Sequence, residues 1–216
     1  MRAANVSPKE DPQSNKRLHG RALRIEWFIV IYNVLEAAVA VTAGLIAGSA
    51  ALMSFGLDSG IEVGAAGIVL WRLYQAGPNA SRRRRARFEK WTLYFIAGTF
   101  VLLAGYIVFE SMEAIVQQKS ADDSPIGLTL AGLSILIMPV AGWLKYRTGC
   151  AMESEALKAD AIETFVCVYL SFALLAGVGL NMAFGWWWSD TAGALAMLPV
   201  ILWQAWQTYE EARENE

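Results

Sequence analysis

The chain has 216 residues, of which 56% are hydrophobic, and its net charge is −2. Soluble domains average about 45–50% apolar residues, and the excess here lies in long blocks, so the composition disfavours a soluble enzyme and favours a protein that crosses a membrane several times. The two cysteines, Cys150 and Cys167, are separated by about 25 Å of helical rise, too far for a disulfide.

Residues 1–24 form a polar, basic stretch that lacks the apolar centre of a secretory signal peptide. We expect a short disordered cytoplasmic tail here, with the single histidine, His19, in solvent. One histidine cannot build a metal site by itself, and the sequence has no histidine-rich loop.

Six stretches have the roughly 20 mostly apolar residues that a membrane-spanning helix needs. The tight connection at Gly48 and Ser49 predicts that the first two form a hairpin. The sequence therefore predicts an all-α integral membrane domain over residues 25–209, a bundle of six transmembrane helices, followed by a short tail over residues 210–216. The predicted spans are residues 25–47, 51–74, 91–116, 126–146, 156–180 and 190–209.

The distribution of positive charge predicts the direction of the spans. Six Lys and Arg residues lie in the N-terminal tail and seven lie between Arg72 and Lys90, whereas the connections on the other side carry only Lys119. Because Lys-rich and Arg-rich loops stay in the cytoplasm, both termini are predicted to be cytoplasmic. The run of four arginines from residue 82 is interpreted as a topology anchor facing anionic lipid, and no nucleic-acid partner is expected.

Two pairs of potential metal ligands lie inside the predicted spans. Asp58 and Glu62 are four residues apart in the second span, and Glu163 and Cys167 are four apart in the fifth, so each pair shares a helix face. An ionisable group in the bilayer core costs at least ~2.5–3.5 kcal/mol, which makes it a functional candidate by default. Three carboxylates and a thiol suit a tetrahedral Zn²⁺ or a similar soft divalent ion.

Structural alternatives exist for these residues. A lone buried cysteine such as Cys167 often acts as a small hydrophobic side chain, and buried acids can be protonated and hydrogen-bonded between helices. Three further polar groups are predicted as auxiliary residues of an ion pathway: Asn33, Glu36 and Asp160. Asp160 could be an entry ligand or could pair with Lys158, and Asp190 is interpreted as the N-cap of the last span.

With these motifs in place, the chain resembles the transmembrane domain of cation diffusion facilitators, six-span exporters of divalent transition metals. The family's second-span motif is similar to Gly48-Ser49 followed by Asp58-Ser59-Gly60-Ile61-Glu62. Its fifth-span motif is matched at Ser154, Ala156, Ala159 and Asp160, and its opening of the sixth span is similar to Trp188-Ser189-Asp190.

Two departures from the family pattern affect what the resemblance implies. Glu163 stands where the family has a histidine and Cys167 where it has the last aspartate, so the metal preference is not carried over. The cytoplasmic domain that follows the sixth span in longer members is not seen after it here, so the chain resembles the short branch of the family. A homodimer is a less secure expectation for that reason.

The resemblance implies a secondary transporter, not an enzyme, in a bacterial-type inner membrane. It would export a divalent cation, Zn²⁺ first and also Cd²⁺ or Co²⁺, by alternating access coupled to protons. Metal ligands must be deprotonated to bind, so metal binding should release protons. The competing hypothesis is a membrane protein that binds metal as a sensor or modulates a partner. An intramembrane enzyme is weakly supported, because no nucleophile and base accompany the acids.

Overall fold

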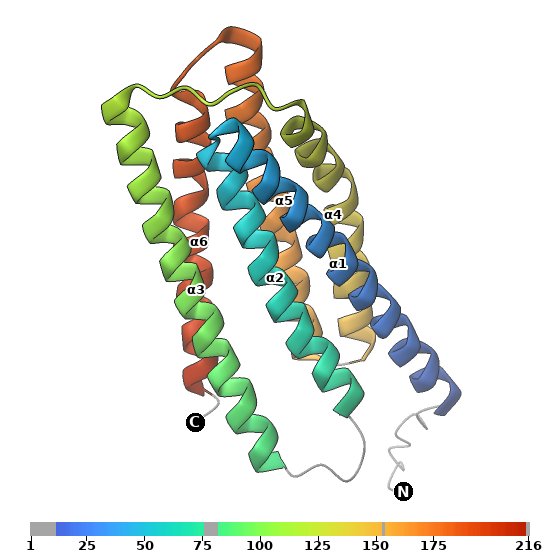
Figure 1. Cartoon of the computed structure of the whole chain (residues 1–216). Helices are drawn as coiled ribbons and strands as arrows, with labels where there is room; N and C mark the ends of the chain where they lie inside the picture. The colour runs from blue at the N-terminus through green and yellow to red at the C-terminus, as the bar shows by residue number, and fades with distance from the viewer. Residues whose placement is uncertain (1–11, 76–81, 153, 215–216) are drawn as a thin grey trace, which may run out of the picture.

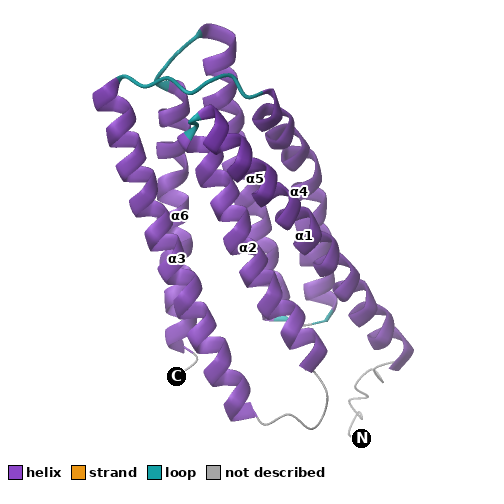
Figure 2. Cartoon of the chain, viewed as in Figure 1, coloured by secondary structure: helices purple, strands orange, loops and turns teal. Residues whose placement is uncertain are grey.

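The computed structural model describes residues 12–75, 82–152 and 154–214, and within these ranges it contains helices and no strands (Figure 2). The predicted all-α fold is confirmed for the described residues. The helices are α1 (Pro12–Ala47), α2 (Ala50–Gln75), α3 (Arg82–Gln117), α4 (Pro125–Ala151), α5 (Glu155–Phe184) and α6 (Ser189–Glu214).

The six helices run alongside one another as a single bundle (Figure 1). The closest neighbours are α1 with α2, α4 with α5, and α3 with α6, while α2 also contacts α3, α5 and α6. The contact between α2 and α5, which carry the two pairs of predicted ligands, is therefore confirmed. The beginning of α1 and the end of α6 lie toward the same end of the bundle, opposite the hairpin between α1 and α2 (Figure 1).

Five of the described helices are long and apolar enough to cross a membrane, namely α1 to α5. The sixth span and the orientation of the bundle stay predictions from the sequence. The helices begin earlier than predicted at the arginine-rich end, since α1 starts at Pro12 and α3 at Arg82. Helical structure thus extends past the apolar blocks, because polar residues such as Lys and Arg are also good helix formers.

The α1–α2 hairpin is tight because glycines let the two helices approach closely. A Cβ atom added at Gly56 would lie 2.8 Å from the Val41 backbone nitrogen, and one added at Gly44 would lie 2.8 Å from that of Met53. Gly60, Gly64 and Gly67 have no neighbour at that position within 4 Å. Among these α2 glycines, Gly56 is therefore the one that makes a close helix contact, and it faces α1.

Asp190 joins α6 to the start of α2 at the end of the bundle where the α1–α2 hairpin lies. Its Oδ1 accepts a hydrogen bond from the Ser49 hydroxyl at 2.5 Å, and its Oδ2 accepts one from the Ala50 backbone nitrogen at 2.8 Å. Ser49 Oγ in turn accepts from the Leu52 backbone nitrogen at 3.0 Å. Asp190 therefore satisfies the free N–H groups at the start of α2, not those of its own helix as the N-cap interpretation expected.

We predict that Asp190→Ala lowers the free energy of unfolding by about 2–3 kcal/mol, because it leaves buried donors at the start of α2 without their charged acceptor. Asp190→Asn, which keeps one oxygen, should cost less. Thermal unfolding of the protein in detergent measures both changes. Asp123→Asn, at an exposed position on the same end, is the control, and an Asp190→Ala variant as stable as this control would refute the role.

The predicted orientation of the helices across the membrane can be tested by thiol labelling. A cysteine placed at Arg84 should react with a membrane-impermeant thiol reagent only from the cytoplasmic side, and a cysteine at Asp122 only from the outside, because the basic connections stay in the cytoplasm. Both labels are introduced into a background in which Cys150 is replaced by serine. The reverse labelling pattern would overturn the predicted topology.

Candidate metal site

The two carboxylates of α2 lie in the interior of the bundle. Asp58 is 4% exposed and Glu62 is 6% exposed, although both are charged residue types. Glu62 Oε1 accepts a hydrogen bond from the Thr164 hydroxyl of α5 at 3.3 Å. Because Asp58 and Glu62 are one turn apart on α2, both face the region between α1 and α5. The prediction that this pair lies inside the bundle agrees with the structure.

Glu36 of α1 joins this region and is anchored by hydroxyl groups. Its Oε2 accepts a hydrogen bond from Ser59 of α2 at 2.9 Å, and its Oε1 accepts one from Ser134 of α4. Ser134 also shares a hydrogen bond of 2.9 Å with the Tyr32 hydroxyl. Hydroxyls from α2 and α4 therefore hold the Glu36 side chain of α1 in place, and Glu36 itself is only 1% exposed.

Polar atoms of two neighbouring residues have no hydrogen bond within the described ranges. These are Oδ1 of Asp58 and both amide atoms of Asn33, which is fully buried close to Glu62. A buried polar atom without a partner is costly and is rare in folded proteins. Oxygens of this kind are available to coordinate a cation.

Cys167 lies on the α5 side of the same region. It is 1% exposed and its thiol faces the Glu62 carboxylate. Thr164, one turn earlier on α5, is also buried and contacts Glu62. The second cysteine, Cys150, is exposed near the end of α4 and contributes nothing here. The structure thus brings Cys167 together with Glu62, Asp58 and the polar residues of α1.

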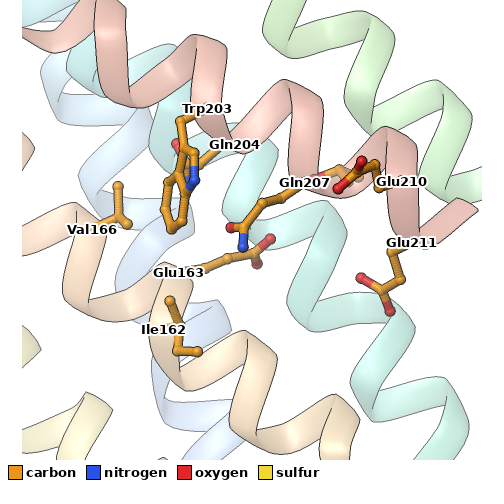
Figure 3. A pocket seen from close by; sticks show the side chains of 9 residues that line it. Ile162, Glu163, Val166, Trp203, Gln204, Gln207, Glu210 and Glu211 are labelled. Atoms are coloured by element: carbon orange, nitrogen blue, oxygen red, sulfur yellow. The ribbon is translucent and has the colours of Figure 1, made fainter.

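Glu163 points in a different direction from Cys167. Its side chain reaches toward Gln207 of α6 and lines a pocket of about 230 Å³ between α5 and α6 (Figure 3). Glu210 and Glu211 of α6 line the same pocket. Thr164 faces α2, where it donates to Glu62. Adjacent residues on a helix point about 100° apart, and Glu163, which directly precedes Thr164, therefore faces the pocket beside α6.

Asp160 pairs with Lys145, a residue for which the sequence suggested no role in the interior of the bundle. It forms a buried ion pair with Lys145 of α4, which also lies 3.5 Å from Glu26 of α1. Sequence reasoning missed Glu26, although it lies seven residues before Asn33 and thus on the same face of α1. Lys145 lies at the end of the predicted fourth span, where a lysine is expected to reach the interface.

In this conformation, no three His, Cys, Asp or Glu side chains of the described residues are gathered closely enough to hold an ion. Asp58, Glu62 and Cys167 share one buried region, and Asn33 and Glu36 border it, whereas Glu163 lies in the neighbouring pocket. Oxygen and thiolate donors of this kind are ligands for Zn²⁺ and related ions. Glu163 does not join the other three predicted ligands in this structure.

The sequence is similar to a known family profile and to two known proteins. The profile of the cation efflux transmembrane domain matches residues 27–215. An uncharacterized transporter of the cyanobacterium Synechocystis is 28% identical over 162 residues, which make up 73% of this chain and 52% of that protein. Transmembrane protein 163 of Xenopus laevis is 22% identical over 197 residues, 90% of this chain and 69% of that protein.

The chain spans about half the length of the cyanobacterial transporter. The family match, in contrast, extends from residue 27 in α1 through the end of α6. The resemblance inferred from the motifs of α2 and α5 is thereby confirmed, and the apolar helices α1 to α5 agree with a multi-pass membrane protein. The chain belongs to the cation efflux family.

Proposed function

We propose that the chain is a secondary transporter that exports a divalent transition metal cation, Zn²⁺ first, from the cytosol across a bacterial-type inner membrane. The observation that carries the proposal is the burial of Asp58 and Glu62 beside Cys167, in the middle of helices that are apolar enough to span a membrane. Charge in that environment is costly, and a divalent cation would neutralise it.

The proposed ligands are Asp58, Glu62, Cys167 and Glu163. Oδ1 of Asp58 has no hydrogen bond in the described residues, so binding an ion would break no existing contact of that atom. Glu163 is one turn from Cys167 on α5, and a rotation of its flexible side chain away from Gln207 would supply the fourth donor. Glu36 and Asn33 support the site, Glu36 through Ser59 and Ser134.

Coupling to protons follows from the chemistry of these ligands. Carboxylic acid and thiol groups release protons when a metal ion binds to them, and they take protons up when it leaves. If the bundle opens to one side with metal bound and to the other with protons bound, inward movement of protons drives outward movement of metal. The proposed mechanism is therefore proton-coupled alternating access.

Replacement of either α2 carboxylate tests the site. We predict that Asp58→Asn and Glu62→Gln each lower zinc transport by more than roughly 100-fold, beyond the 10–100-fold typical of residues that only support a ligand. Both variants should insert and fold, because removing a buried charge eases insertion. Zinc flux into proteoliposomes that contain the purified protein is the measurement.

Glu113→Gln, on α3 and outside the proposed site, is the matched control and should transport normally. Wild-type flux in both α2 variants would refute the site. A wild-type protein that binds zinc tightly but gives no flux would favour the competing hypothesis of a metal sensor.

Cys167 determines the metal preference in this proposal. Cys167→Asp should keep transport but shift selectivity from Cd²⁺ toward Mn²⁺, because oxygen donors favour harder ions. Cys167→Ala should lose most binding, while Cys150→Ala should change nothing, because Cys150 is exposed. Competition flux assays with paired metals give the selectivity. If Cys167→Ala transports with unchanged preference, the thiol only packs.

A further inference from the structure

A second group of charged residues lies inside the bundle, apart from the proposed metal ligands. It consists of Glu26 on α1, Lys145 on α4 and Asp160 on α5, which are 0%, 0% and 3% exposed. Lys145 forms ion pairs with Asp160 and, at 3.5 Å, with Glu26. Three helices therefore meet at one ammonium group that is removed from solvent.

The two carboxylates of this group share a single ammonium. One ammonium faces two carboxylates, and the ammonium also donates a hydrogen bond to Thr164 at 3.2 Å. Oε1 of Glu26 and Oδ1 of Asp160 are buried and make no hydrogen bond within the described residues. The group thus has two buried carboxylate oxygens available to a cation. A structural ion pair would more commonly have its buried oxygens satisfied.

The group is connected to the proposed metal site through one side chain. The Thr164 hydroxyl accepts from Lys145 at 3.2 Å and lies 3.3 Å from Oε1 of Glu62. On α1, Glu26, Asn33 and Glu36 are all buried and follow one face. They span about 15 Å of helical rise, so polar groups continue from Lys145 into the metal site.

The group also lies near the predicted cytoplasmic end of the bundle. Lys145 is about 9 Å of helical rise from the end of α4 at Ala151. A lysine side chain can extend its four methylene groups along apolar surface and carry its ammonium toward water.

We propose that Glu26 and Asp160 form a second divalent-cation site, on the cytoplasmic side of Glu62, and that Lys145 is its resting occupant. This inference rests on the proposed export function. An ion with two charges attracts two carboxylates more strongly than one ammonium does, so an entering metal displaces Lys145 toward the cytoplasm. The ion then moves past Thr164 to Glu62, and the returning ammonium closes the route behind it.

The test counts the zinc ions bound to the full chain in detergent by equilibrium dialysis, alongside flux in proteoliposomes. The wild type should bind one ion per chain, and Lys145→Met should bind two, because its unpaired carboxylates retain a metal. Zinc flux of Lys145→Met should fall roughly tenfold or more, since the ion is held at the second site. Lys119→Met, which breaks an exposed ion pair with Glu110 at 4.0 Å, is the matched control and should behave as wild type.

The triple variant Glu26→Gln, Lys145→Met, Asp160→Asn removes all three charges and decides the question even if Lys145→Met does not fold. It should bind one ion but show a roughly tenfold lower initial flux at low zinc. Wild-type flux in the triple variant, or a single bound ion in a folded Lys145→Met protein, would overturn the second site. Absence of zinc flux in the wild type would instead refute the export function, and the ion count of Lys145→Met would still decide whether Glu26 and Asp160 bind metal.

Discussion

The cost of placing a charge inside a membrane bundle constrains the interior of this protein. Glu36 is held by hydroxyls from α2 and α4, Asp160 by the ammonium of Lys145, and Asp190 by backbone donors at the start of α2. Removing one partner of a buried ion pair typically costs about 3–5 kcal/mol. These contacts therefore fix how α1, α2, α4, α5 and α6 sit around Asp58, whose Oδ1 has no hydrogen bond in the described residues.

Much of the fold could be predicted from the sequence, because apolar blocks of about 20 residues have few structures open to them in a bilayer. The spacing of four between Asp58 and Glu62 also sufficed to place both in the interior. The direction of Glu163 could not be predicted, since helical periodicity gives a face but not the path of a long side chain. The partner of Asp160 was missed because a lysine near the end of a span is normally taken to reach the interface.

In the proposed transport chemistry, the cost of burying charge acts at two places, the metal site and the pair Glu26 and Asp160. At the metal site, carboxylates and a thiol in an apolar surrounding attract a divalent ion or protons, and alternating between the two couples their movements. At Glu26 and Asp160, an internal ammonium neutralises part of the charge until a metal arrives. Family membership supports cation efflux, and the exchange of a histidine and an aspartate for Glu163 and Cys167 gives this chain its own donor set.

The coordination of the bound ion is the most direct test of this account. X-ray absorption at the zinc edge on the zinc-loaded protein should show one sulfur at ~2.3 Å and oxygens at ~2.0–2.2 Å. The sulfur signal should disappear in Cys167→Ala, and the oxygen shell should change in Asp58→Asn. A coordination shell that contains no sulfur and is unaffected by either substitution would contradict a metal site formed by α2 and α5.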